Sequence, residues 1–248
     1  RQMCIRDRIM SRLFIIRHGQ ASFLSDNYDQ LSENGCSQAK FLGENLSSQD
    51  IVFDSVYCGN LVRQVDTAEI VKSVYDKKHI NFPEIQKKEH LNEYPAEEIM
   101  TSLGKYLIEN DASASELFKK CNNATEEIDR HRYFQKLFEL ILESWVKNEH
   151  TEVNLSMTWS QWSDQVRRVL DEIMHNAKKG ELIGIFSSGG PIGVSVQTAL
   201  EAPDMKAAEL NWRIYNCSVT KFSFNKHRFT LDQFNDTSYL SEELLTYR

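Results

Sequence analysis

The sequence predicts an α/β fold, a three-layer α/β/α sandwich with a mostly parallel sheet and a helical cap insertion. Two continuous apolar runs, residues 13–16 and 182–186, are typical of strands that are buried on both faces of a parallel sheet. Segments with helical periodicity alternate with the strand-like segments, as they do in α/β folds. From about residue 95 to about residue 160 the pattern is almost wholly helical, and we interpret this stretch as an insertion that caps the ligand site.

The composition is that of a globular protein and excludes several classes of function. The chain has 248 residues, of which 41% are hydrophobic and 26% charged. Its 29 basic and 36 acidic side chains give a net charge of −7, which disfavours nucleic acid as a partner because clustered Lys and Arg hold a phosphate backbone. No apolar stretch approaches the roughly 20 residues of a membrane span. The five cysteines are scattered without a Cys-x-x-Cys pair, so we expect reduced thiols in a soluble, cytoplasmic protein.

The N-terminal residues 1–9 differ from the rest of the chain. They mix Arg and Asp with a lone Cys and show neither strand nor helix periodicity. Residues 3–8 resemble a translated sequencing-library adapter, so we interpret residues 1–9 as a non-native leader and expect Met10 to be the natural start. Residues 10–248 are then expected to form a single domain that carries the helical insertion.

Two strand–helix units are predicted before the insertion. The strand at 13–16 precedes a helix that Ser32 caps and whose apolar positions recur at helical spacing. A second strand, residues 53–57, leads through a turn to a helix that begins near residue 61. Residues 79–88 alternate like a strand, and Pro83 within them indicates the edge of the sheet.

The helical stretch contains two predicted helix starts and one broad apolar stripe. Ser113 with Glu116 and Asn123 with Glu126 have the spacing of capping boxes. The apolar residues between 128 and 146 recur at helical spacing. We interpret this stripe as core packing against neighbouring helices and not as a cofactor or partner site.

The remaining elements complete the predicted sheet. Thr158 with Gln161 resembles another capping box, and Gly180 fits the C-terminal end of the helix that it opens. The strand at 182–186 and a further helix follow. Residues 219–224 and 228–234 alternate around a turn, which predicts a hairpin at an edge of the sheet.

Polar sequences follow both buried strands. Arg17-His18-Gly19 comes directly after the first strand, and Ser187-Ser188-Gly189-Gly190 follows the second. Because parallel strands end at the same edge of a sheet, these segments meet if the strands are neighbours. The second segment is glycine-rich and opens a helix, so its free N–H groups suit an anion. A neutral imidazole beside a guanidinium in the first segment suits attack on a phosphoryl group.

These segments resemble the motifs of the histidine phosphatase superfamily, which includes the phosphoglycerate mutases. The opening motif is similar to residues 17–21, and the resemblance continues through residues 28–35 and 38–39. The second arginine motif resembles residues 58–64 with 67–68, the acid-bearing segment resembles residues 91–93, and the late glycine motif resembles residues 187–192. The resemblance spans residues 13 to about 223, and the helical insertion matches least.

The resemblance implies roles for named side chains. His18 would be the nucleophile that forms a phosphohistidine, and Arg17 and Arg63 would neutralise the phosphoryl oxygens. Ser188 and Gly189 would also bind the phosphate. Asn216 is a candidate for supporting the site from a following strand.

The catalytic acid is left with alternatives. By the resemblance Glu93 would protonate the leaving oxygen and then deprotonate the attacking water. Glu97 and Glu98 lie close to it in the sequence and could take the same role.

The chain departs from the family at one position. Where the family usually has a second histidine, this chain has Ser188, which offers only a neutral hydrogen bond. Losing one donor that acts in the transition state costs on the order of 10²–10³ in rate, so a slow enzyme is expected. His90 could fill the gap, but a structural or surface role is the better expectation.

Three functions therefore stay open at this point. The first is a metal-independent phosphomonoesterase without a cofactor, whose partner is a small phosphorylated substrate. The second is a non-catalytic phosphate-binding or regulatory module, and the third is a phosphoglycerate-mutase-type phosphotransferase. The sequence predicts neither the substrate, which the insertion would select, nor the oligomeric state.

Overall fold

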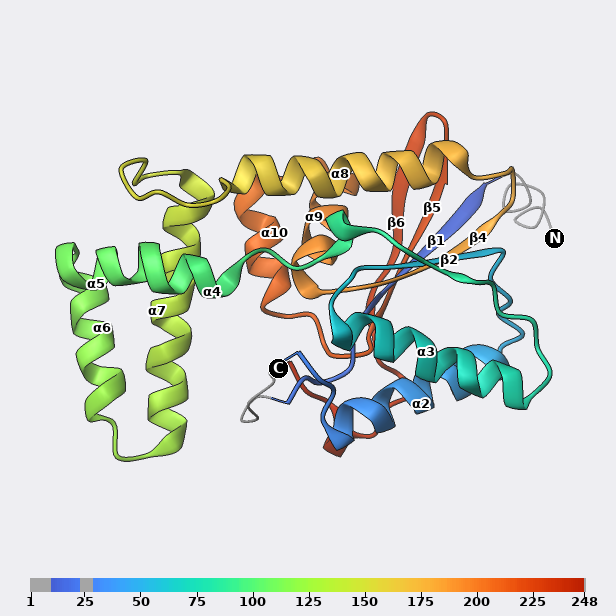
Figure 1. The fold of residues 1–248 in the computed structure, drawn as a ribbon, viewed down its shortest axis with the longest axis horizontal. Helices are drawn as coiled ribbons and strands as arrows, with labels where there is room; N and C mark the ends of the chain where they lie inside the picture. Colours follow the sequence, from blue (N-terminus) through green and yellow to red (C-terminus); the bar gives the residue numbers. More distant parts are fainter. Residues whose placement is uncertain (1–9, 23–28, 248) are drawn as a thin grey trace. The chain divides into compact units, whose positions relative to one another are not determined.

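The computed structural model describes residues 10–22 and 29–247, so our expectation for residues 1–9 lies outside the described residues. The described residues form a mixed α/β fold around a six-stranded, mostly parallel sheet, in the order β3-β2-β4-β1-β5-β6 (Figure 1). The strands are β1 (Ser11–Arg17), β2 (Ser55–Cys58), β3 (Ile85–Lys87), β4 (Leu182–Ser187), β5 (Val219–Asn225) and β6 (Arg228–Asp236). The predicted fold class is confirmed.

The pairing of the strands confirms the two buried strands as neighbours. β1 pairs in parallel with β4, and β4 pairs in parallel with β2. All six residues of β4 are buried, which explains its continuous apolar sequence. The predicted hairpin is present as β5 and β6, which pair with each other in antiparallel fashion at one edge.

The strand that the sequence predicts over residues 79–88 is much shorter. Only Ile85–Lys87 pairs with β2, at the other edge of the sheet. Pro83 lies just before this strand, where its missing N–H costs no ladder hydrogen bond. The edge position is therefore confirmed and the length is wrong.

Helices cover both faces of the sheet (Figure 1). On one face lie α2 (Glu33–Ser48) and α3 (Val62–Lys77), whose buried residues pack with Phe14, Ile16 and Phe186 in one core cluster. On the other face lie α9 (Gly189–Ala199), α10 (Asp204–Asn211) and the C-terminal part of α8 (Trp159–Asn176). Within the described part of the chain, no helix is both long and apolar enough to cross a bilayer.

Residues 94–164 form a second compact, helical unit. It contains α4 (Ala96–Ile99), a π-helical turn (Met100–Gly104), α5 (Lys105–Asn110), α6 (Ala112–Asn123), α7 (Glu127–Lys147) and the start of α8. The predicted apolar stripe is buried at Leu137, Ile141, Leu142 and Trp145. Its first member is not part of the core, because Ile128 is 79% exposed.

Two of the predicted helix starts are confirmed by their hydrogen bonds. The Ser32 hydroxyl accepts a hydrogen bond from Gly35 N at 3.0 Å and caps α2. Gln161 Oε1 accepts from Thr158 N at 2.8 Å, and Thr158 Oγ1 accepts from Gln161 N at 3.3 Å, which is a complete capping box. α8 ends at Asn176, before Gly180, which adopts a positive φ of 81° in the turn that follows.

The two helix starts that were predicted within the helical stretch, at Ser113 and Asn123, are wrong. Ser113 lies inside α6, because Asp111 accepts a hydrogen bond from Ala114 N at 2.7 Å and caps the helix two residues earlier. Asn123 is the last residue of α6, and α7 begins at Glu127. In both cases the sequence holds several residues that favour N-caps, and the backbone path selects among them.

Candidate active site

The ends of β1 and β4 bring the two polar segments together. Arg17 is paired with Ser187 in the register of these strands, and His18 N donates a hydrogen bond to Ser187 O at 2.9 Å. His18 therefore leaves the sheet beside the N-terminus of α9, at the carboxyl edge where open sheets bind ligands.

His18 is held in one tautomer by its neighbours. Its side chain is buried, with 5% of its surface exposed. His18 Nδ1 lies 2.7 Å from Gly19 O and therefore carries the proton, since a carbonyl only accepts. His18 Nε2 accepts a hydrogen bond from Arg63 Nε at 3.1 Å. The atom directed at the guanidinium is thus a neutral nitrogen with a lone pair.

The charge state of His18 follows from burial and from the two arginines. Burial lowers the pKa of His18 well below 6.5, because a buried imidazolium loses its hydration. The positive charges of Arg63 and then Arg17 lower the pKa further, while the hydrogen bond to Gly19 O raises it. The imidazole is neutral at pH 7 and available as a nucleophile.

Asp29 holds Arg63 in place. Arg63 Nη1 donates to Asp29 Oδ1 at 2.6 Å, and Asp29 Oδ2 accepts a hydrogen bond from Val62 N at 2.7 Å. One carboxylate thus ties the guanidinium to the first turn of α3. Arg17, the other predicted phosphate ligand, donates from Nη1 to the carbonyl oxygen of Ile214. After burial and Arg63, its positive charge is a further cause that lowers the pKa of His18.

Gln64 on α3 contacts Ser188, the N-cap residue of α9. Both side chains are fully buried. Gln64 Nε2 donates to Ser188 Oγ at 2.7 Å and to Leu91 O at 3.2 Å. Because Gln64 is the donor in this pair, the hydrogen of the Ser188 hydroxyl remains available to an acceptor.

Glu93 lies at the N-terminus of α9. Its two carboxylate oxygens accept hydrogen bonds from Gly190 N at 3.1 and 3.2 Å. The helix N-terminus that was predicted to hold an anion therefore binds this carboxylate. Gly189, which precedes Gly190 in the sequence, packs closely on Asn211. A Cβ added to Gly189 would lie 2.0 Å from Asn211 Oδ1.

Glu97 and Glu98, the alternative acids, lie in the helical unit, and His90 lies on the surface. Glu98 belongs to the helical unit, where its carboxylate accepts hydrogen bonds from Ser156 N at 2.6 Å and Ser156 Oγ at 2.5 Å. Glu97 lies on the same short helix, α4. His90 is exposed, in agreement with the expected surface role.

The turn that precedes β5 supports the backbone of the site. Asn216 Nδ2 donates to His18 O at 3.1 Å, and Cys217 N donates to the same oxygen at 3.2 Å. Asn216 Oδ1 in turn accepts from Thr246 Oγ1 at 2.9 Å. Asn216 therefore contacts the main chain of His18, from a turn and not from the strand that the sequence analysis expected.

Comparison with known proteins decides the family. The family model described as histidine phosphatase superfamily (branch 1) matches residues 13–133 and 123–237. The chain belongs to the histidine phosphatase superfamily. The resemblance inferred from the motifs is confirmed, and the superfamily match also extends across the helical stretch that resembled it least.

Solved structures share this superfamily fold at low sequence identity. A phosphoserine phosphatase from Entamoeba histolytica, in complex with 3-phosphoglyceric acid, matches 94% of this chain and 100% of its own, with a TM-score of 0.59 and 18% identity. A phosphoglycerate mutase from Bacillus anthracis matches 94% of this chain and 96% of its own, with a TM-score of 0.60 and 19% identity. At these identities the likeness shows the fold alone.

Curated relatives match over a shorter stretch. The serine/threonine-protein phosphatase Pgam5, mitochondrial, of Drosophila grimshawi is 35% identical over 72 residues, which are 27% of this chain and 25% of the relative. The Drosophila virilis protein of the same name is 35% identical over 77 residues, 28% of this chain and 27% of the relative. The chain thus matches about a quarter of the length of these relatives.

Sequence reasoning missed the partners of the superfamily residues. Asp29 and Gln64 lie within the motifs at residues 28–35 and 58–64, but the sequence alone indicated no role for them. Nor did it indicate one for Thr67, whose Oγ1 accepts from Gly19 N at 3.0 Å and donates to Arg63 O. A usable signal was present for Gln64, since a polar residue next to an arginine on a buried helix face needs a partner.

A glycine beside this network gives a testable prediction. A Cβ on Gly59 would lie 1.9 Å from Gln64 Oε1 and 2.7 Å from Asn92 Oδ1. We expect Gly59→Ala to lower the free energy of unfolding by about 1–3 kcal/mol, because the fully buried Gln64 side chain has to shift. Urea unfolding measures this loss.

The double variant Gly59→Ala/Gln64→Ala provides the control for that prediction. It removes the atom that overlaps most, so its destabilisation should be smaller than the sum of the two single effects. Additive losses would show that Gly59 is needed for a reason other than its contact with Gln64.

Proposed function

We propose that this histidine phosphatase superfamily member is a metal-independent phosphomonoesterase that works through a phosphohistidine at His18 Nε2. The observation that carries the proposal is the hydrogen bond from Arg63 Nε to this nitrogen, at 3.1 Å. It supports a deprotonated Nε2 that faces a phosphate-binding group. The two arginines supply the positive charge that phosphoryl transfer needs, so the proposed reaction uses no metal.

In the first step the substrate phosphate displaces His18 Nε2 as the acceptor of the hydrogen bond from Arg63 Nε. The anion binds Arg63 and Arg17 bidentately, which frees Nε2 for attack in line with the leaving oxygen. The N–P bond forms, the P–O bond breaks, and Glu93, which enters this step in its protonated form, gives its proton to the leaving alcohol. The Ser188 hydroxyl, whose oxygen accepts from Gln64, donates its hydrogen to a phosphoryl oxygen.

In the second step water removes the phosphoryl group. Glu93 takes a proton from the attacking water, the new P–O bond forms, and the N–P bond breaks to return neutral His18. The carboxylate position at the N-terminus of α9 supports this role, since the backbone N–H of Gly190 orients it.

The experiment that tests the proposal measures phosphate released from a panel of phosphomonoesters. We expect slow hydrolysis that vanadate inhibits, because vanadate imitates the transition state of phosphoryl transfer. Acid-labile, alkali-stable phosphate should be trapped on the protein during turnover, as a phosphohistidine requires. Binding of phosphate with no release and no trapped intermediate would favour the regulatory module. Isomerised product with little free phosphate would favour the mutase.

The lowered pKa of His18 predicts how activity depends on pH. The imidazole stays neutral as the pH falls through 6.5, so kcat/KM, corrected for ionisation of the substrate, should show no loss there. The loss should begin only at the lower pKa that burial and Arg63 produce. An acid limb at or above 6.5 in the pH profile would contradict a buried, neutral nucleophile.

The same shift predicts a pH-dependent stability with a defined sign. The unfolded chain protonates His18 near pH 6.5 while the folded protein does so only at lower pH, so the unfolded state binds more protons between these values. The stabilisation is complete above 6.5 and is lost as the pH falls toward the folded pKa. Urea unfolding across this range, beside His18→Ala, isolates the contribution of this residue.

A further inference from the structure

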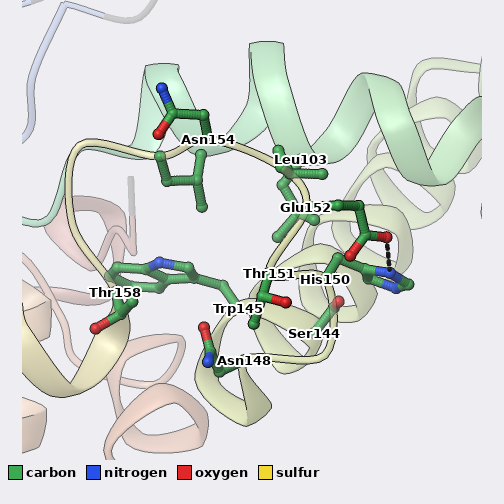
Figure 2. Close-up of a pocket in the computed structure, with 11 residues that line it drawn as sticks. Leu103, Ser144, Trp145, Asn148, His150, Thr151, Glu152, Asn154 and Thr158 are labelled. Atoms are coloured by element: carbon green, nitrogen blue, oxygen red, sulfur yellow. Dashed lines mark hydrogen bonds and ion pairs between the residues drawn. The ribbon is translucent and has the colours of Figure 1, made fainter.

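The helical unit contains a cavity of its own. Its volume is about 230 Å³, and it lies between the π-helical turn, the end of α7 and the loop that leads to α8. Figure 2 shows the side chains around it, among them Leu103, Ser144, Trp145, Asn148, Thr151 and Asn154. The mechanism proposed above uses none of these residues.

One buried hydroxyl in this cavity lacks a partner. Ser144 is 3% exposed, and its Oγ has no hydrogen-bond partner in the described structure. A serine in a helix usually satisfies its hydroxyl on a carbonyl one turn earlier, and Ser144 does not. A buried polar group without a hydrogen bond costs free energy, so a natural structure generally supplies an acceptor or donor from elsewhere.

Three other neutral side chains line the cavity, and they belong to exposed residues. Among the described residues, no hydrogen bond is made by the side chains of Asn148, Thr151 or Asn154. Together with Ser144 they offer hydroxyl and amide groups that donate and accept at once. Asn148 is placed there by a left-handed backbone, φ 54°, at the end of α7.

The charged groups at the cavity are already engaged. Glu152 Oε1 accepts from the Tyr106 hydroxyl at 2.7 Å. It also lies 3.3 Å from His150 Nδ1 (Figure 2). Among the described residues that line the site there is no Lys or Arg that would select an anion, and its carboxylate is shared by two neighbours. This charge balance favours an uncharged ligand.

Apolar surface completes the lining. Leu103, Val153 and Leu155 contribute aliphatic groups, and Trp145 contributes an indole whose N–H is used by Met157 O at 3.2 Å. The ring therefore offers only apolar surface. A ligand that fits must carry both hydroxyl groups and C–H faces.

We propose that this cavity binds a small, uncharged polyhydroxyl compound, a polyol or a monosaccharide. Its volume equals that of roughly eight liquid-water molecules, which suits a ligand of about three to six carbon atoms. Each ligand hydroxyl both donates and accepts, which matches the groups at Ser144, Asn148, Thr151 and Asn154. The C–H faces lie against Leu103 and Trp145. This proposal is independent of the phosphatase reaction.

The test is a titration of the full chain followed by NMR. The probes are glycerol, D-glucose and myo-inositol, with glucosamine and gluconate as charged counterparts. We expect saturable shifts of the amide resonances of residues 144–158 with at least one neutral probe. We also expect glucosamine and gluconate to bind more weakly than glucose. No saturable shift with any neutral probe would overturn the proposal and leave water as the occupant. Tighter binding of glucosamine than of glucose would overturn it in favour of an amine site at Glu152.

Variants separate ligand contacts from effects on folding. Ser144→Ala and Thr151→Val should each weaken the binding of the best probe roughly 2- to 12-fold, the range for one lost hydrogen bond. Because the Ser144 hydroxyl has no partner in the protein, Ser144→Ala should leave the Tm of the free protein unchanged or raise it. Ser113→Ala, an exposed helical serine outside the cavity, is the matched control and should bind as the wild type does. Equal affinity in all three variants would overturn the assignment.

Discussion

Replacing His18 with alanine should abolish phosphohistidine formation and lower kcat by at least about 10⁴, the scale seen when a covalent nucleophile is removed. The imidazole is buried and its Nε2 accepts a hydrogen bond from Arg63, and alanine leaves no atom in that place that could accept a phosphoryl group. Residual activity would then come from the arginines and bound water alone. Single-turnover phosphate release and trapping of the acid-labile phosphate measure the loss.

A matched control shows whether the His18→Ala site is still assembled. The main-chain contacts of His18, from Asn216 and to Ser187, do not involve the side chain and should survive. Vanadate and phosphate should therefore still bind to the variant. Phosphate release by the variant at the wild-type rate would contradict the proposed mechanism. Loss of both phosphate release and anion binding would indicate that the variant no longer assembles the site.

The sheet was predictable because its central strands have a simple environment. β4 is buried at every position and so is apolar at nearly every position, and β1 is similar. The strand order was not predictable in the same way, because it depends on which helix connects to which face. The short β3 shows the limit, since residues 79–88 alternate in sequence but only Ile85–Lys87 finds a partner strand.

The sequence was enough to predict which backbone segments form the site, but not which side chains contact one another within it. The strand end at His18 and the helix start at Ser188 are local features, and parallel pairing alone brings them together. The contacts of Arg63 with Asp29 and of Gln64 with Ser188 join residues that are far apart in the sequence. Such pairs depend on side-chain directions that neither periodicity nor spacing contains.

The second large effect is expected for Arg63. Arg63→Gln should lower kcat/KM on the order of 10²–10³, because one charged donor to the phosphoryl group is lost in the transition state. It should also raise the pKa of His18 toward 6.5, since the Arg63 charge is one of the causes that lower it. The acid limb of the pH profile should therefore move to higher pH. Steady-state kinetics across pH measure both effects in one experiment.

Asp29→Asn is the control that separates charge from position. This variant keeps an acceptor for Val62 N and keeps the Arg63 charge, but it removes the ion pair at 2.6 Å. We expect kcat/KM to fall by no more than about tenfold, which is the scale of one partly exposed ion pair. We expect no upward shift of the acid limb of the pH profile. Equal losses in both variants with an unmoved acid limb would mean that Arg63 only supports the structure. A large loss confined to Arg63→Gln, together with the shifted limb, would instead require its positive charge to act on His18 and on the transferring phosphoryl group together.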